Sequence, residues 1–136
     1  MKAAVCYEFG QPLVIEDLEL APPRRGEVKV RMVATAICHS DVHAILGDWG
    51  GELPVVVGHE AAGIVETLGD GVTRVKPGDP VVVSLLRSCG ACLFCSTGAP
   101  HMCDATYLAD IDSPLRTHSG QVVRHGIRTV GHSTRR

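Results

Sequence analysis

The chain has 136 residues, 45% of them hydrophobic, with a formal charge of −2 and a pI near 6.4. This length favours one domain, and the near-neutral charge gives no general case for nucleic-acid binding. No apolar run reaches the length of a membrane span, and the N-terminus lacks the apolar segment of a signal peptide. We therefore expect a cytoplasmic protein, in which the six cysteines favour metal binding over disulfides.

The predicted elements are mostly short strands separated by glycine and proline turns. Alternating or continuous apolar residues predict six extended segments, over residues 2–7, 13–20, 28–32, 53–57, 61–68 and 81–83. The last of them is expected to be buried. Ser40 can cap a short helix that runs to about Leu46, and the glycine-rich stretch 47–51 ends it. Many short strands predict a mainly β fold, such as a small barrel or a folded sheet.

The composition changes after residue 112. Five arginines and no acidic residue follow Asp112, and residues 131–136 do not resemble a strand that continues the fold. We therefore expect an ordered domain over residues 1–112. Residues 113–136 are expected to form a basic tail that is either disordered or the product of a shifted reading frame.

Four closely spaced cysteines form the strongest chemical signal in the chain. They lie within residues 88–104 with the pattern Cys89-x2-Cys92-x2-Cys95-x7-Cys103. Tetrahedral zinc takes four such thiolates, and a closed shell of four protein ligands is typical of structural sites. The alternatives are a pair of disulfides or a redox Cys-x-x-Cys, which the reducing compartment and the lack of a helix pattern at Cys89 disfavour.

A second candidate metal site combines Cys38, His59 and Glu60. One thiol, one imidazole and one carboxylate are ligands that suit zinc. Gly58 and Gly63 flank His59 and would let the backbone turn tightly there. Taken singly, Cys38 would be a small buried side chain and His59 a core histidine, which are the commoner roles.

Two motifs in this region resemble the catalytic zinc site of zinc-dependent, medium-chain alcohol dehydrogenases. They are Cys38-His39-Ser40-Asp41-x-His43 and Gly58-His59-Glu60-x-x-Gly63, and the four-cysteine lobe follows as it does in the family. The resemblance covers residues 1 to about 112 and implies a GroES-like β-barrel catalytic domain. No G-x-G-x-x-G fingerprint follows a strand, so the Rossmann cofactor domain of the family is absent and the chain is expected to be a fragment.

The resemblance implies metal-assisted hydride transfer between a small alcohol or aldehyde and NAD or NADP. Cys38 and His59 would hold the catalytic zinc. The third ligand of the family lies beyond the length of this chain, so Glu60 is the candidate substitute. With that site incomplete and the cofactor domain missing, the isolated chain is expected to be inactive.

Further roles follow from the positions that match the family motifs. Ser40 and His43 would form a proton relay, and Asp41 would orient His59. His39 would contact the cofactor, and Trp49 and Leu85 would line the substrate pocket. Each position also has a plain structural reading: a helix cap for Ser40, a helix-dipole charge for Asp41, solvated side chains for the two histidines, and packing for Trp49 and Leu85.

Two other classes of function stay open. The chain could be a non-catalytic zinc-binding or interaction module held together by the four-cysteine lobe. A nucleic-acid-binding zinc protein is the weakest alternative, because the lobe has only Arg87 nearby and little aromatic surface for stacking. An oligomer or a complementing chain is compatible with all of these readings.

Overall fold

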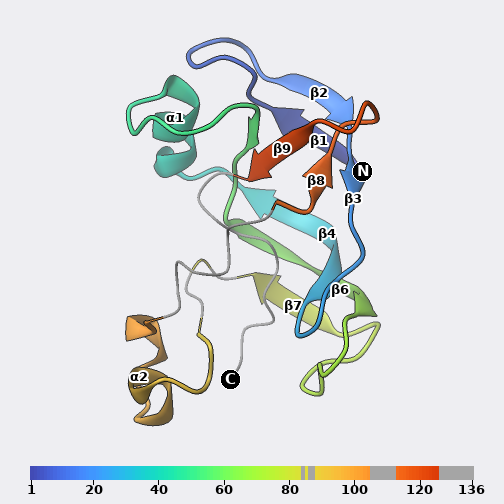
Figure 1. The fold of residues 1–136 in the computed structure, drawn as a ribbon, viewed down its shortest axis with the longest axis vertical. Helices are drawn as coiled ribbons and strands as arrows, with labels where there is room; N and C mark the ends of the chain where they lie inside the picture. The colour runs from blue at the N-terminus through green and yellow to red at the C-terminus, as the bar shows by residue number, and fades with distance from the viewer. Residues whose placement is uncertain (84, 86–87, 105–112, 126–136) are drawn as a thin grey trace.

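The computed structural model describes residues 1–83, 85, 88–104 and 113–125, and these residues form a mainly β fold (Figure 1). Short strands make three sheets. One eight-residue helix, α1 (His39–Leu46), lies beside them. A separate lobe carries the short helix α2 (Leu93–Ser96) and the 3₁₀ turn η1 (Pro100–Met102). The predicted mainly β class is confirmed. No Rossmann fold occurs among the described residues.

Two small sheets enclose the hydrophobic core. In the first, β1 (Lys2–Val5) pairs antiparallel with β2 (Val14–Asp17). In the second, the order is β3 (Glu19–Leu20), β8 (Leu115–Arg116), β9 (Val122–His125) and β5 (Val55–Val56), with β5 and β9 parallel. Val5, Leu18, Leu115 and Val123 form a buried cluster between the two sheets. The core therefore joins the two ends of the described chain.

That core corrects the predicted boundary at residue 112. Residues 113–125 were expected to belong to a basic tail, yet β8 and β9 lie within them and contribute Leu115 and Val123 to the core. Ser113 is also buried, and its hydroxyl donates to the carbonyl of Val123 at 2.5 Å. The remainder of the predicted tail, residues 126–136, lies outside the described residues.

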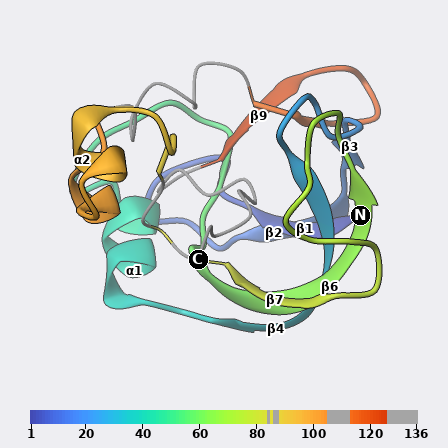
Figure 2. The ribbon, with the colours of Figure 1, turned by 90° about the horizontal axis from the view of Figure 1, so that it is seen from below.

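The third and largest sheet has the order β4 (Val28–Ala36), β6 (Glu60–Leu68) and β7 (Pro80–Val83), all antiparallel. It curves strongly, as the view along the long axis shows (Figure 2). Gly63 does not make the tight turn that the sequence suggested. It lies within β6, where an added Cβ would be 2.4 Å from the carbonyl oxygen of Arg31, so glycine allows the two strands to approach closely.

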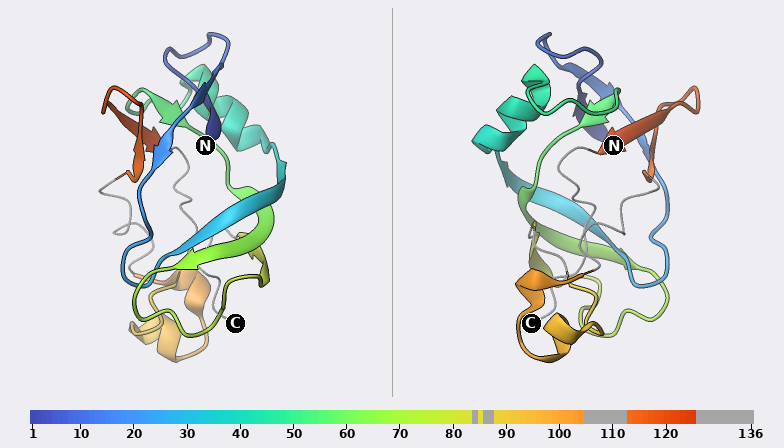
Figure 3. Two further views of the ribbon diagram at one scale, coloured as in Figure 1. Left: turned by 90° about the vertical axis from the view of Figure 1, so that its right-hand side faces the viewer. Right: turned by 60° about the vertical axis from the view of Figure 1, so that its left-hand side comes forward.

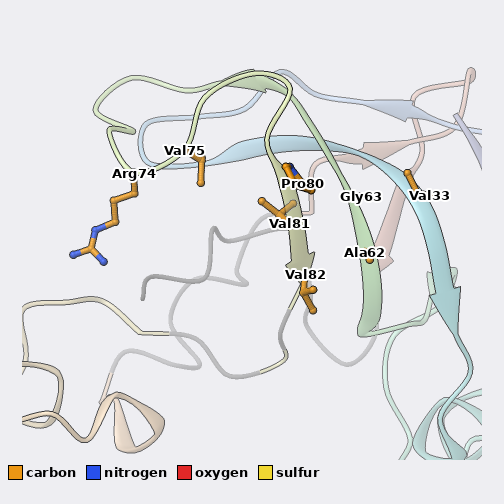
Figure 4. A pocket seen from close by; sticks show the side chains of 8 residues that line it. All are labelled: Val33, Ala62, Gly63, Arg74, Val75, Pro80, Val81 and Val82. Atoms are coloured by element: carbon orange, nitrogen blue, oxygen red, sulfur yellow. The ribbon is translucent and has the colours of Figure 1, made fainter.

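One face of this sheet is hollow and apolar. An open cavity of ≈ 760 Å³ lies over β4, β6 and β7 and the loop before β7 (Figure 4). Val33 and Val82 line it and are 66% and 70% exposed, so the prediction that 81–83 form a buried strand holds only for Val83. Arg74, from the loop, is the one charged residue among the described side chains that line it.

Helix α1 and the four-cysteine lobe lie at opposite ends of the long axis, as two further views confirm (Figures 1 and 3). The helix begins two residues earlier than predicted, because its N-cap is Cys38 and not Ser40. Among the described residues there is no helix with the length and apolarity needed to cross a membrane.

Candidate functional site

Strand pairing brings Cys38 and His59 together, although 21 positions separate them in the sequence. Ala36 at the end of β4 is paired with Glu60 at the start of β6. Cys38 therefore leaves one strand where His59 enters the other, and Gly58 bends the chain there with a φ of 130°. The ligand atoms of Cys38, His59 and Glu60 all lie within 4.8 Å of one another. The structure thus groups the three predicted residues of the open site.

Asp41 lies next to both Cys38 and His59. Its Oδ2 accepts a hydrogen bond from the backbone N–H of Cys38 at 2.9 Å, which caps the start of α1. Its Oδ1 lies 3.2 Å from Nδ1 of His59. These two atoms are buried and are not aligned as a hydrogen bond, and neither has another partner. Asp41 therefore sits on the Nδ1 side of the imidazole.

The other imidazole nitrogen of His59 faces the cluster. Nε2 is 3.8 Å from Oε1 of Glu60, and the His59 side chain is only 8% exposed. A thiol, an imidazole nitrogen and a carboxylate oxygen are a donor set that suits zinc. A carboxylate behind the second imidazole nitrogen is also the usual support for a metal-bound histidine. The residues present therefore fit a zinc ion.

Helix α1 carries the other predicted side chains of this site. Ser40 is half-buried in the first turn. His39 and His43 lie one turn apart with their rings edge to face and their centroids 4.7 Å apart. The ring centroids of Trp49 and His43 are 5.4 Å apart, and Trp49 is 61% exposed. Leu85 is exposed in the segment that follows β7.

One contact in this region was missed by the sequence analysis. Oδ2 of Asp48 lies 2.6 Å from Nδ1 of His43. The sequence analysis gave Asp48 no role beyond its place in the stretch that ends the helix. A signal was available, because a glycine that ends a helix turns the chain back toward the last turn. The next residue can then meet a side chain one turn earlier.

The four-cysteine lobe brings its sulfur atoms into one cluster. The ligand atoms of Cys89, Cys92, Cys95 and Cys103 lie within 4.8 Å of one another, with Sγ–Sγ distances of 4.0 Å from Cys89 to Cys95 and from Cys92 to Cys103. Zinc–sulfur bonds of about 2.3 Å place the corners of a tetrahedron about 3.8 Å apart. None of the four thiols is in a disulfide. The cluster therefore fits a four-thiolate zinc site and does not contain the alternative pair of disulfides.

The thiols of this lobe are not equivalent. Backbone N–H groups of Ala91 and Cys92 point at the sulfur of Cys89 from 3.4 and 3.3 Å, and they lower the pKa of that thiol to about 6. Backbone hydrogen bonds from Cys95 and Asp104 also lower the pKa of Cys92. Desolvation instead raises the pKa of Cys95 to about 11. The loop backbone thus already stabilises two of the sulfurs in the thiolate form that metals bind.

Comparison with known proteins identifies the class. The family model of the alcohol dehydrogenase GroES-like domain matches residues 24–128. This match covers most of the chain and both cysteine-containing clusters. The chain therefore belongs to the alcohol dehydrogenase GroES-like domain family.

Two curated relatives and two solved structures resemble the chain closely. The NDMA-dependent alcohol dehydrogenase of Amycolatopsis methanolica is 48% identical over 123 residues, which are 88% of this chain and 33% of the relative. The putative alcohol dehydrogenase D of Mycobacterium tuberculosis is 46% identical over 121 residues, 86% of this chain and 33% of the relative. The chain thus spans about a third of the length of these relatives.

The structural matches agree with the fold. The crystal structure of an alcohol dehydrogenase zinc-binding domain protein from Burkholderia ambifaria superposes with a TM-score of 0.83 at 35% identity, covering 91% of this chain and 35% of that one. Zinc-dependent alcohol dehydrogenase 2 from Streptococcus pneumonia, in its apo form, gives a TM-score of 0.68 at 36% identity, covering 76% and 30%.

Proposed function

We propose that this chain is the zinc-binding catalytic domain of an alcohol dehydrogenase that acts on small alcohols or aldehydes with NAD or NADP. The observation that carries the proposal is the cluster of Cys38, His59 and Glu60, whose ligand atoms lie within 4.8 Å with Asp41 behind His59. Such a cluster at the start of a helix and a strand can hold a metal while leaving one side open. The family membership supports the same reaction class.

The roles of the residues follow from their atoms. Cys38 Sγ, His59 Nε2 and a Glu60 oxygen would hold zinc, which when bound polarises the oxygen of an alcohol and prepares it for hydride transfer to a nicotinamide. Asp41 keeps His59 turned so that Nε2 faces the cluster. The hydroxyl of Ser40 can both donate and accept a hydrogen bond, which a relay of the alcohol's proton requires. His43 is partly exposed on the same helix and would pass that proton to solvent.

The remaining predicted contacts complete this proposal. His39 is exposed next to Cys38 and would touch the cofactor, while Trp49 and Leu85 would border the substrate. The four-cysteine cluster would bind a structural zinc that folds its own loop and takes no part in the reaction.

The second candidate function is a non-catalytic zinc-binding or interaction module. The feature that favours it is the position of the four-cysteine lobe, which lies at the far end of the molecule from α1 (Figure 3). Under this alternative only the lobe would bind metal. The number of zinc ions per chain therefore separates the two proposals.

Zinc analysis of the purified chain, with variants of each cluster, tests the proposal. We expect two zinc ions per chain, of which the one at Cys38 leaves first when a mild chelator is added, because that site has fewer thiolates. Cys38→Ser should lose that ion alone. The double variant Cys92→Ser, Cys95→Ser should lose the other ion and unfold the lobe. Cys6→Ser is the matched control, since Cys6 lies in neither cluster and should leave both ions in place.

Two outcomes would count against the proposal. A single zinc that survives Cys38→Ser would favour the non-catalytic module. A folded zinc-free double variant would rule out a structural zinc in the lobe. Glu60→Gln tests the third ligand separately, because an unchanged chelator resistance in this variant would remove Glu60 from the ligand set.

A cytoplasmic location is part of the proposal. None of the six cysteines forms a disulfide and four are clustered in a way that fits metal binding, which suits a reducing compartment. Assembly with a second copy or with a complementing chain is compatible with the exposed apolar hollow of the large sheet.

A further inference from the structure

The imidazole of His43 is contacted on three sides. Asp48 approaches Nδ1 at 2.6 Å, His39 packs edge to face one turn earlier, and the indole of Trp49 lies at a tilt of 32° to the ring. An exposed histidine on a helix usually has several rotamers available. Here Asp48 and Trp49, which follow the helix, and His39, which lies one turn before His43, restrict the ring together.

The end of α1 explains why Asp48 reaches His43. Gly47 ends the helix in the left-handed region with a φ of 84°, and its N–H donates to the carbonyl of Ala44 at 3.3 Å. The N–H of Asp48 then donates to the carbonyl of His43 at 3.1 Å. Asp48 is therefore tied to His43 twice, by its backbone and by its carboxylate. The backbone bond needs no side chain, so the helix end should persist when the carboxylate is removed.

The second contact has a chemical consequence. A carboxylate can only accept a hydrogen bond, so the nitrogen that faces Asp48 must carry the hydrogen. In a neutral imidazole, the other nitrogen then has a free lone pair. We propose that Asp48 is a positioning residue that fixes the Nδ1–H form of His43 and leaves Nε2 to accept the proton. This inference rests on the proposed function, in which His43 ends the relay that begins at Ser40.

Among the described residues, the charged and titratable groups that contact His43 are Asp48 and His39. Asp48 is half exposed and His39 is exposed, so solvent screens both of them. The effect of Asp48 is therefore mainly geometric: it selects one nitrogen and one ring orientation. Trp49 adds a flat apolar surface that keeps the ring from turning away.

Nitrogen-15 NMR of the histidine side chains tests the inference directly in the full chain. Spectra are recorded at about pH 8, where an ordinary imidazole is neutral, and His43→Gln assigns the signal. We expect His43 of the unaltered chain to carry its hydrogen on Nδ1. In Asp48→Ala the hydrogen should move to Nε2 in most molecules. Asp48→Asn should keep the Nδ1–H form, because the amide oxygen still accepts a hydrogen bond.

Asp70→Ala is the control, since Asp70 is an exposed carboxylate on the turn after β6 and should leave the signal unchanged. The inference is overturned if His43 of the unaltered chain carries its hydrogen on Nε2, or if Asp48→Ala leaves the form unchanged. The first result needs no variant of Asp48, so it holds even where Asp48→Ala disturbs the helix. Neither result depends on zinc or on hydride transfer, so failure here is distinguishable from failure of the proposed function.

Discussion

Two thiols of the four-cysteine lobe differ strongly in acidity because their surroundings differ. Cys89 receives two backbone N–H groups and has a pKa of about 6, while desolvation raises the pKa of Cys95 to about 11. The folded-state pKa of Cys89 thus lies below the ordinary value of 9.0. The thiolate therefore stabilises the folded lobe fully above pH 9, and this stabilisation is lost as the pH falls through about 6.

This difference predicts the order of alkylation in the zinc-free chain. At about pH 7.5, iodoacetamide should modify Cys89 before Cys95, since only the thiolate is nucleophilic. The rate at Cys89 should fall once the pH drops below about 6. Peptide mass spectrometry after short labelling measures both rates. Zinc-loaded chain is the control, because bound sulfurs should be protected, and equal rates at the two cysteines would contradict the prediction.

Asp41 is the other residue whose environment predicts a measurable effect. It is buried, accepts the N–H of Cys38 and lies 3.2 Å from His59 Nδ1. Asp41→Ala should lower the free energy of unfolding by about 1–3 kcal/mol, because it leaves the partly buried N–H of Cys38 unsatisfied. It should also weaken zinc at the Cys38 site by about 10–100-fold. Asp41→Asn keeps a hydrogen-bond acceptor and should therefore lose less stability and less zinc affinity.

Urea unfolding of the zinc-free chain and competition with a chelator separate these two effects. The four-cysteine site offers an internal control in the same sample, because it lies at the other end of the molecule (Figure 1). An Asp41→Ala chain with unchanged zinc affinity at the Cys38 site would show that Asp41 acts only as a helix cap.

At the scale of elements, the sequence predicted those parts that depend on local patterns. The end of the helix at Leu46 and the strand beginning at Val28 follow from glycine and alternation, whereas the N-cap was wrongly assigned to Ser40. The four-cysteine cluster was predicted from its spacing and the Cys38 cluster from its donor set and the family resemblance, and in each the ligand atoms lie together. The strands at 115–116 and 122–125 were missed. They are two and four residues long and their surroundings are rich in arginine. They pair with each other, but β3 and β5, which lie far away in the sequence, complete their sheet.

The position of Gly63 within its strand also depends on long-range pairing. Its absent side chain leaves room for Arg31 and Val30 of β4, next to a shift in the strand register. Local sequence shows the glycine but does not show which backbone it approaches. The same pairing of β4 with β6 sets the distance between Cys38 and His59. The close approach of the two strands at Gly63 and the metal cluster therefore depend on one another.

Gly63→Ala tests this dependence. A Cβ at this position would lie 2.4 Å from the Arg31 carbonyl oxygen and 2.6 Å from a Val30 methyl group, so one strand must move. We expect a loss of about 1–3 kcal/mol in the free energy of unfolding, the usual cost of overpacking. Thr67→Ala, at an exposed position of the same strand, should have a smaller effect. A fully stable Gly63→Ala chain would mean that β4 and β6 are not this close in solution.

Considered as a whole, the molecule separates its core from its candidate sites. The buried cluster lies between the two small sheets, whereas the large sheet leads from α1 toward the four-cysteine lobe (Figure 3). That sheet exposes Val33 and Val82 around an open apolar hollow. Apolar surface of this kind commonly belongs to an interface. The described chain thus presents the side chains proposed to act on the alcohol on a scaffold with uncovered apolar surface.

This arrangement leads to a prediction about activity. Cys38, Ser40, His43 and His59 are the residues proposed to act on the alcohol, but no Rossmann fold occurs among the described residues to hold a nicotinamide. Hydride transfer needs the two reactants about 3–3.5 Å apart, and such positioning can supply about 7–11 kcal/mol of the barrier. The 136-residue polypeptide assayed alone, zinc-loaded and free of host dehydrogenases, should therefore oxidise short alcohols with NAD or NADP far more slowly than about 1 per second.

A chimera supplies the positive half of the same test. The Amycolatopsis methanolica relative is 48% identical to this chain over 123 residues, so its matching segment can be replaced by the corresponding residues of this chain. If these residues form a competent catalytic domain, the chimera should oxidise alcohols in the assay used for the relative, and Cys38→Ser should abolish that activity. A folded, zinc-loaded chimera without activity would count against the proposed function. Ordinary turnover by the 136-residue polypeptide alone, lost in Cys38→Ser, would instead show that these residues can hold the cofactor themselves.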